Sequence, residues 1–229
     1  MEIDKFQEKL YGIFQRYHQL NNLNIFSTKI TFLLYDAGIS EEALNLFYNF
    51  GIKLYNNNYY NFSIIVFITL QEFLRIKNKE HQIITENKEN QLISECHIYI
   101  GQADYNLRNY SNAIESYNEA LKIKKKINDL DGEALIYGNL GIIYDDLKQY
   151  DEAIDYHNHS LDIAKMKGDK ETEAKCYANL GVSYYNLRDF QKALEYHNKA
   201  LEIAKMIGNK KIEAISYTNL GLVHNSLGD

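Results

Sequence analysis

Residues 177–201 read YANLGVSYYNLRDFQKALEYHNKAL, and residues 137–161 read YGNLGIIYDDLKQYDEAIDYHNHSL. The two stretches share a tyrosine, the triplet Asn-Leu-Gly, an alanine and the pair His-Asn at matching places, 40 residues apart. Glycines at Gly101 and Gly221 continue the same spacing in both directions. A fixed period of this length is typical of stacked repeat architectures, so the copies predict structural units that pack on one another.

Each copy contains two amphipathic helical patterns separated by a short polar turn, which in the second copy is Arg188–Asp189. Gly181 and Ala193 are small, so we expect the two helices to approach closely there. A bulky side chain at Gly181 is expected to overpack this contact, at a cost of roughly 1–3 kcal/mol. Gly168 and Gly208 suit the left-handed position that ends a helix. A single hairpin leaves its apolar face uncovered, so neighbouring hairpins must stack.

The composition is that of an ordinary soluble protein, with 45% apolar and 24% charged residues among 229. The net charge is −6 and the charges are interspersed, so no basic stripe predicts a nucleic-acid partner. The longest apolar run, Ile64–Leu70, is too short to span a bilayer, and the N-terminus lacks the apolar core of a signal peptide. Cys96 and Cys176 occupy the same repeat position, which favours two buried thiols over a disulfide or a metal site. We therefore expect a cytoplasmic protein without a membrane or nucleic-acid partner.

The repeat resembles the tetratricopeptide repeat. That family's pattern carries an aromatic residue, Leu-Gly, tyrosine, alanine, an aromatic residue and alanine at fixed offsets. The matching residues here are Tyr177, Leu180, Gly181, Tyr184, Ala193, His197 and Ala200. The resemblance covers about residues 92–229 and implies an all-α fold, a right-handed superhelical solenoid of antiparallel helix hairpins. The family's common period is about 34 residues. The longer period resembles that of spindle-orientation adaptors, kinesin light chains and bacterial peptide-sensing regulators, all of which bind peptides.

Three regions are expected along the chain. Residues 1–40 carry two helical patterns, which we interpret as an N-terminal hairpin that is either a cap or a degenerate repeat. Residues 41–91 follow the repeat offsets around Gly51, with Ser40 as a helix N-cap and with an insertion near 78–90 that forms a loop or extends the flanking helices. Residues 92–229 are predicted to form three repeats and the first helix of a truncated further repeat. We accordingly expect a fragment of a longer protein, and a homo-oligomer through the uncapped last repeat stays open.

The chain carries no recognisable catalytic or metal-binding pattern. A Gly-rich phosphate loop, a nucleophile elbow and a zinc-spaced cluster are all missing from the sequence. His157 and His197 replace an aromatic residue of the repeat, so we interpret both as packing residues. The pair Asp145–Asp146 is expected to be exposed, in recognition or solvation. We predict a protein that is not an enzyme, with no catalytic residue, no metal and no cofactor.

In the family, the concave face of the solenoid is lined by the first helix of each repeat, and the resemblance carries this lining onto the present chain. Amides recur there at Asn139, Asn179 and Asn219. They either pair with the backbone of an extended peptide or bond between helices, and both interpretations stay open. The family's clamp for a C-terminal carboxylate is disfavoured, because Ile98 and Gln102 stand where its first lysine and asparagine belong. The predicted binding residues are Gln102, Tyr105, Asn106, Asn139, Ile142, Asp145, Asp146, Lys175, Asn179, Val182, Tyr185, Asn186 and Asn219.

The function favoured by these patterns is a non-catalytic protein–protein interaction module, a scaffold or adaptor that binds a peptide or a partner domain in the concave groove. The alternative is a peptide-sensing regulatory domain of a longer protein whose effector domain lies outside this sequence. An enzyme would need catalytic residues that this chain does not supply.

Overall fold

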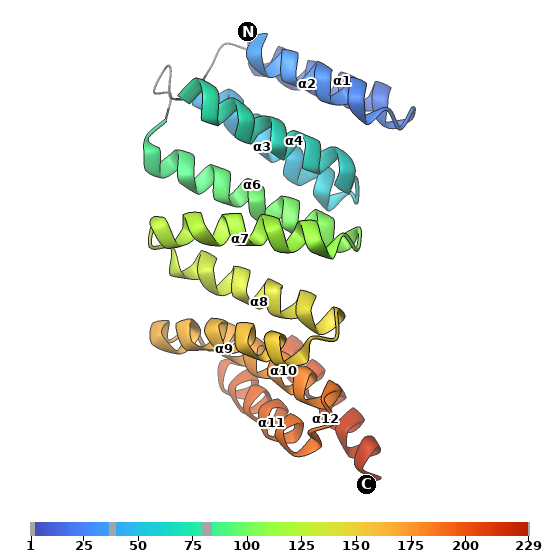
Figure 1. Ribbon diagram of the computed structural model, residues 1–229, viewed down its shortest axis with the longest axis vertical. Coiled ribbons are helices and arrows are strands. Elements are labelled where there is room, and N and C mark those ends of the chain that lie inside the picture. The colour runs from blue at the N-terminus through green and yellow to red at the C-terminus, as the bar shows by residue number, and fades with distance from the viewer. Residues whose placement is uncertain (1–2, 37–39, 79–83, 229) are drawn as a thin grey trace. The chain divides into compact units, whose positions relative to one another are not determined.

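The computed structural model describes residues 3–36, 40–78 and 84–228, and every regular element within them is a helix. The chain divides into two compact units, residues 1–127 and 128–229 (Figure 1). Residues 79–83, which belong to the predicted insertion, lie outside the described residues. Among the described helices, none combines the length and the apolar character needed to cross a bilayer.

The first unit consists of helices paired as antiparallel hairpins: α1 with α2, α3 with α4, and α6 with α7. Helix α4 also packs against both α2 and α6. The predicted N-cap is confirmed, since the Ser40 Oγ accepts the backbone N–H of Ala43 at 3.2 Å. The elements are α1 (Ile3–His18), α2 (Leu23–Asp36), α3 (Glu41–Asn56), α4 (Tyr60–Phe73), the π-helix η1 (Leu74–Asn78), α6 (Glu86–Asn106) and α7 (Tyr110–Lys126).

Aromatic rings fill the core of the first unit. The Phe14 ring meets the rings of Phe26, Phe50 and Phe62 edge-on, with centroids 5.6–6.4 Å apart. These rings come from α1, α2, α3 and α4, so the N-terminal hairpin shares one core with the hairpin that follows it. Edge-to-face contacts of this kind add to the free energy gained by burying the rings.

The second unit has five consecutive helices, each packed against the next: α8 (Leu130–Asp146), α9 (Tyr150–Lys167), α10 (Lys170–Asn186), α11 (Phe190–Ile207) and α12 (Lys210–Leu227) (Figure 1). The predicted helix ends are confirmed, because Gly168 and Gly208 both adopt the left-handed conformation with φ of 70°. Side chains also cap the N-termini of α8, α10, α11 and α12. For example, the Asp169 carboxylate accepts the backbone N–H groups of Glu171 and Thr172 at 3.1 Å.

The repeat glycine and one ring account for the close pairing of each hairpin. A Cβ placed on Gly141 would lie 2.4 Å from Cε1 of His157, and one on Gly181 would lie 2.5 Å from Cε1 of His197. Phe67 stands against Gly51 in the same way. The predicted close approach of the helices is therefore confirmed. The packing role of the two histidines is confirmed as well, since they are 0% and 1% exposed.

Lysine–tyrosine contacts join successive hairpins of the second unit. The Lys165 Nζ on α9 lies 5.3 Å from the ring centroid of Tyr177 on α10, and the Lys205 Nζ on α11 lies 5.2 Å from that of Tyr217 on α12. Each cation–π contact of this kind contributes about 0.5–1 kcal/mol at an exposed site. The same lysine–tyrosine contact therefore links each hairpin to the next at equivalent repeat positions. Cys96 and Cys176 are free and buried, as predicted.

Candidate functional site

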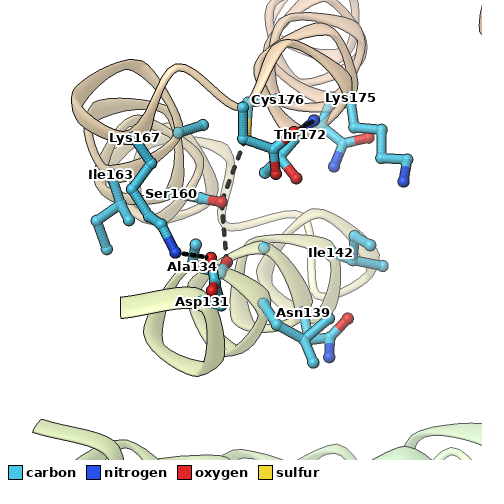
Figure 2. A pocket seen from close by; sticks show the side chains of 15 residues that line it. Asp131, Ala134, Asn139, Ile142, Ser160, Ile163, Lys167, Thr172, Lys175 and Cys176 are labelled. Atoms are coloured by element: carbon cyan, nitrogen blue, oxygen red, sulfur yellow. Dashed lines mark hydrogen bonds and ion pairs between the residues drawn. The ribbon is translucent and has the colours of Figure 1, made fainter. Parts of the chain in front are cut away.

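A pocket of about 380 Å³ lies in the second unit where α8, α9 and α10 meet (Figure 2). Four of the predicted binding residues line it: Asn139 and Ile142 from α8, and Lys175 and Asn179 from α10. Helix α9 adds Ser160, Ile163, Ala164 and Lys167, which the sequence prediction missed because it considered only the first helix of each repeat. The pocket is therefore formed by a hairpin and the first helix of the next one.

Two polar side chains of the pocket interior, Ser160 and Cys176, form hydrogen bonds within the protein. The Ser160 Oγ donates to the backbone carbonyl of Ala134 at 2.8 Å, and the Cys176 Sγ donates to the Ser160 Oγ at 3.2 Å (Figure 2). Burial raises the pKa of the Cys176 thiol, so the thiol stays neutral at physiological pH. The remaining small residues here, Ala164 and Gly138, present no polar side chain. The Ser160 hydroxyl therefore has no proton left to donate to a group that enters this region, although only one of its two lone pairs is taken by Cys176.

The charged residues of the pocket are also paired within the protein. Lys167 forms an ion pair with Asp131 (Figure 2), and Lys175 bonds to Glu171 on the preceding turn of α10 at 2.6 Å. The carboxylate of Asp169 is taken up by the N-terminus of α10, and its hydrogen bonds, chiefly with Thr172, lower its pKa. The pocket thus presents no net excess of either charge.

The two asparagines of the pocket differ in their environment. The Asn139 Nδ2 is buried and has no hydrogen-bond partner among the residues that the structure describes. The backbone carbonyl oxygen of Asn179 lies 3.2 Å from the Ser183 Oγ. Asn139 and Ile142 lie on the side of α8 opposite Lys167 and Ile163 (Figure 2). Because this nitrogen is shielded from solvent, a ligand could bond to it only after the Asn139 side chain changes rotamer.

One buried network adjoins this pocket. The Asp145 Oδ2 on α8 accepts a hydrogen bond from the His157 Nε2 on α9 at 3.1 Å and from the Ser183 Oγ on α10 at 2.9 Å. Since both donors meet the same carboxylate oxygen, the geometry ties three helices together and leaves His157 without a bond to Ser183. That arrangement does not let the histidine take a proton from the serine, as a nucleophilic triad requires.

The network corrects one expectation from the sequence. Asp145 was expected to be exposed, but its side chain is only 12% exposed because it serves as the shared acceptor. Asp146, its neighbour, is exposed. The described residues contain no group of three histidine, cysteine or acidic side chains that is suited to a metal ion.

A family model for the tetratricopeptide repeat matches residues 92–166 and 171–229, which is more than half of the chain. The chain belongs to the tetratricopeptide repeat family. Its fold is accordingly the all-α solenoid of helix hairpins that the resemblance implied. No curated protein sequence matches the chain.

Three solved structures are similar to this chain at low sequence identity. RapI in its apo form has 19% identity and a TM-score of 0.72, covering 93% of this chain and 77% of its own. BtubC from P. vanneervenii has 17% identity and a TM-score of 0.67, covering 99% and 83%. A signal transduction ATPase with a tetratricopeptide repeat sensor from Pyrococcus horikoshii has 19% identity and a TM-score of 0.66, covering 98% and 34%. At these identities the likeness shows the fold alone.

The other predicted groove residues of this tetratricopeptide repeat chain lie outside the pocket. Gln102, Tyr105 and Asn106 belong to α6 of the first unit, where the Asn106 Nδ2 bonds to the Tyr55 hydroxyl at 3.1 Å. On α10, the Tyr185 hydroxyl shares a hydrogen bond of 2.9 Å with the Ser226 Oγ. Val182 and Asn186 are exposed on the same helix, and Asn219 is half-buried on α12. Their role in binding stays a prediction.

His197 and His97 make the stability of the tetratricopeptide repeats depend on pH. Burial lowers the pKa of His197 to about 4, below the value of about 6.5 that the unfolded chain has. Between these values the unfolded chain binds a proton that the folded chain does not, so stability is present above pH 6.5 and is lost as the pH falls toward 4. His97 behaves alike, chiefly through burial.

We expect the replacement His197→Phe to remove part of this pH dependence, because Phe67 fills the same place against Gly51. Chemical unfolding followed at pH 7, 5.5 and 4.5 measures it. Between pH 7 and 4.5, the free energy of unfolding of the wild-type chain should fall by on the order of 1–3 kcal/mol more than that of the variant. Identical losses in the two proteins would show that His197 is protonated equally in both states.

Proposed function

We propose that this tetratricopeptide repeat protein is a protein-interaction module that binds an extended segment of a partner protein in the pocket of the second unit. The observation that carries the proposal is the convergence of Asn139, Ile142, Lys175 and Asn179, from two separate helices, on one pocket. Two amides beside apolar walls offer donors and acceptors for a peptide backbone together with surface for its side chains.

Exposed apolar side chains on α8 and α10 support the proposal. Leu135 is 49% exposed, Ile142 is 37% exposed and Val182 is 36% exposed. Leu135 and Ile142 line the pocket itself. Burying apolar surface contributes roughly 25 cal/mol for each Å² removed from water, so covering these residues would drive association.

The Asn139 amide favours the interpretation in which the recurring asparagines contact a ligand. Its Nδ2 has no hydrogen-bond partner in the described part of the chain and is shielded from solvent, so a rotamer change of Asn139 would bring an unpaired donor to the ligand. A buried donor without a partner costs about 1–3 kcal/mol. A carbonyl oxygen of a bound peptide removes this cost, which adds to the affinity.

The test is a selection of binding peptides from a displayed library of random 12-residue sequences against the whole chain. We expect selected peptides to bind saturably, and Asn139→Ala/Asn179→Ala to weaken them at least about ten-fold, the equivalent of 1.4 kcal/mol. Affinity is measured by calorimetry and helicity by circular dichroism. Helicity should not fall, because alanine is a better helix former than asparagine.

Asn198→Ala is the matched control, since Asn198 is exposed on α11 and does not line the pocket. It should leave the affinity unchanged. A selection that yields no saturable binder, or an equal effect of the control and the double variant, would contradict the proposed function. A parallel loss of helicity and affinity would show that the two amides are structural.

A further inference from the structure

We propose that the pocket of the second unit selects an uncharged, aliphatic side chain of leucine size from the bound segment, and that Gly138 sets this selection. The inference rests on the proposed function for its ligand class, a peptide segment. Its physical basis is the space and the chemistry around Gly138, Ser160 and Cys176.

Gly138 leaves room that the next repeat does not have. A Cβ placed on Gly138 would meet only the Ser160 Oγ, at 3.8 Å, so the position opens into space. The residue 40 positions later is Ala178, and Ser160 is likewise replaced by Ala200. Gly138 is therefore not needed for helix contact, in contrast to Gly141, where a ring fills the place of a side chain.

The chemistry of the space disfavours charged groups. The Ser160 hydroxyl donates its proton to the carbonyl of Ala134, and the Cys176 thiol, which donates to Ser160, stays protonated. Lys167 and Asp131 form an ion pair with each other, so neither charge is left to attract an ionic side chain. A charged group placed here would lose its hydration without gaining a partner of opposite charge, which is unfavourable. An aliphatic group loses nothing and gains contacts.

The apolar lining favours a larger aliphatic group over a smaller one. Leu135 and Ile142 line the pocket from α8, and Ile163 lines it from α9. Each additional buried CH₂ group contributes about 0.8 kcal/mol in transfer from water. A leucine side chain, which has three more carbon atoms than alanine, is therefore preferred over alanine by about ten-fold or more.

The test uses N-acetyl amino acid N-methylamides, each of which carries one side chain and two backbone amides. The leucine, alanine, aspartate and lysine compounds are titrated separately into the ¹⁵N-labelled chain, and backbone amide signals are followed by NMR. We expect saturable shifts at Gly138, Ile142 and Cys176 with the leucine compound. The alanine compound should bind about ten-fold more weakly, and the two charged compounds should not saturate.

Gly138→Leu should abolish the shifts by filling the space, whereas Gly12→Leu, at an open helical position of the first unit, should not. Gly138→Ala serves if the leucine variant does not fold. Equal affinity for the four compounds, or an unchanged response in a folded Gly138 variant, overturns the inference. If selected peptides bind with the same affinity to the wild-type chain and to Gly138→Leu, this inference fails and the proposed function stands. If no peptide is selected yet the leucine compound saturates, the proposed function fails, and only the preference of the pocket for an aliphatic group remains.

Discussion

Replacing Gly141 with alanine is expected to lower the free energy of unfolding by about 3 kcal/mol or more. Overpacking a filled core costs typically 1–3 kcal/mol. Here the new methyl group would lie 2.4 Å from the ring of His157, which is fully buried. The ring cannot swing aside without breaking its hydrogen bond to Asp145. A buried carboxylate that loses a donor adds to the cost.

Two other glycines of the second unit provide matched controls. Gly138→Ala lies on the same helix, and its Cβ would meet only the Ser160 Oγ at 3.8 Å. Gly221→Ala holds the equivalent repeat position on α12, where no atom lies within 4 Å. Both should be neutral or stabilising by up to about 1 kcal/mol, because alanine is the better helix former. Urea unfolding of the three variants measures the difference. A Gly141→Ala variant as stable as the controls would contradict the assigned packing.

Replacing Asp145 with alanine is expected to cost about 3 kcal/mol, the second-largest effect. The change removes the acceptor of both His157 and Ser183, which leaves the imidazole N–H buried without a partner. Removing one partner of a buried hydrogen-bonded pair costs more free energy than the intact bond contributes, because the other partner stays buried and unpaired. The exposed neighbour Asp146 is the control, and Asp146→Ala should change stability by less than about 1 kcal/mol.

A second change separates the lost bond from general disruption. The double variant Asp145→Ala/His157→Phe replaces the unpaired imidazole with an apolar ring. A phenylalanine already occupies the equivalent place in the first unit, where Phe67 packs against Gly51. Removal of both partners costs less than removal of one, so the double variant should recover at least about 1 kcal/mol. Equilibrium unfolding in a double-mutant cycle measures the recovery. If Asp145→Ala is as stable as the wild type, the network does not hold the three helices together.

The repeat made the helices and their contacts predictable from the sequence. Residues shared by the copies, such as Gly141 and Gly181, have one structural purpose in every hairpin. Because each copy confirms the others, the helix ends at Gly168 and Gly208 were predicted as well.

The candidate site was predictable only in part. Asn139 and Asn179 were found because they recur, and Ile142 and Lys175 because the resemblance carried first-helix positions onto this chain. Ser160 was missed, since it belongs to the second helix and differs from Ala200 only by an oxygen atom. The sequence prediction gave Asp145 as exposed, because its hydrogen-bond partners, His157 and Ser183, lie 12 and 38 residues away on other helices. Contacts between residues that do not repeat are not visible in a periodic pattern.

The most direct test of the account is the footprint of a selected peptide on the ¹⁵N-labelled chain, measured as amide shift changes at saturation. The account predicts that the largest changes fall on α8 and α10, centred on Gly138, Asn139 and Asn179. Changes confined to the first unit, or to the surroundings of Tyr156 on α9 and Tyr196 on α11, which do not line the pocket, would contradict the claim that the pocket between α8, α9 and α10 is the binding site.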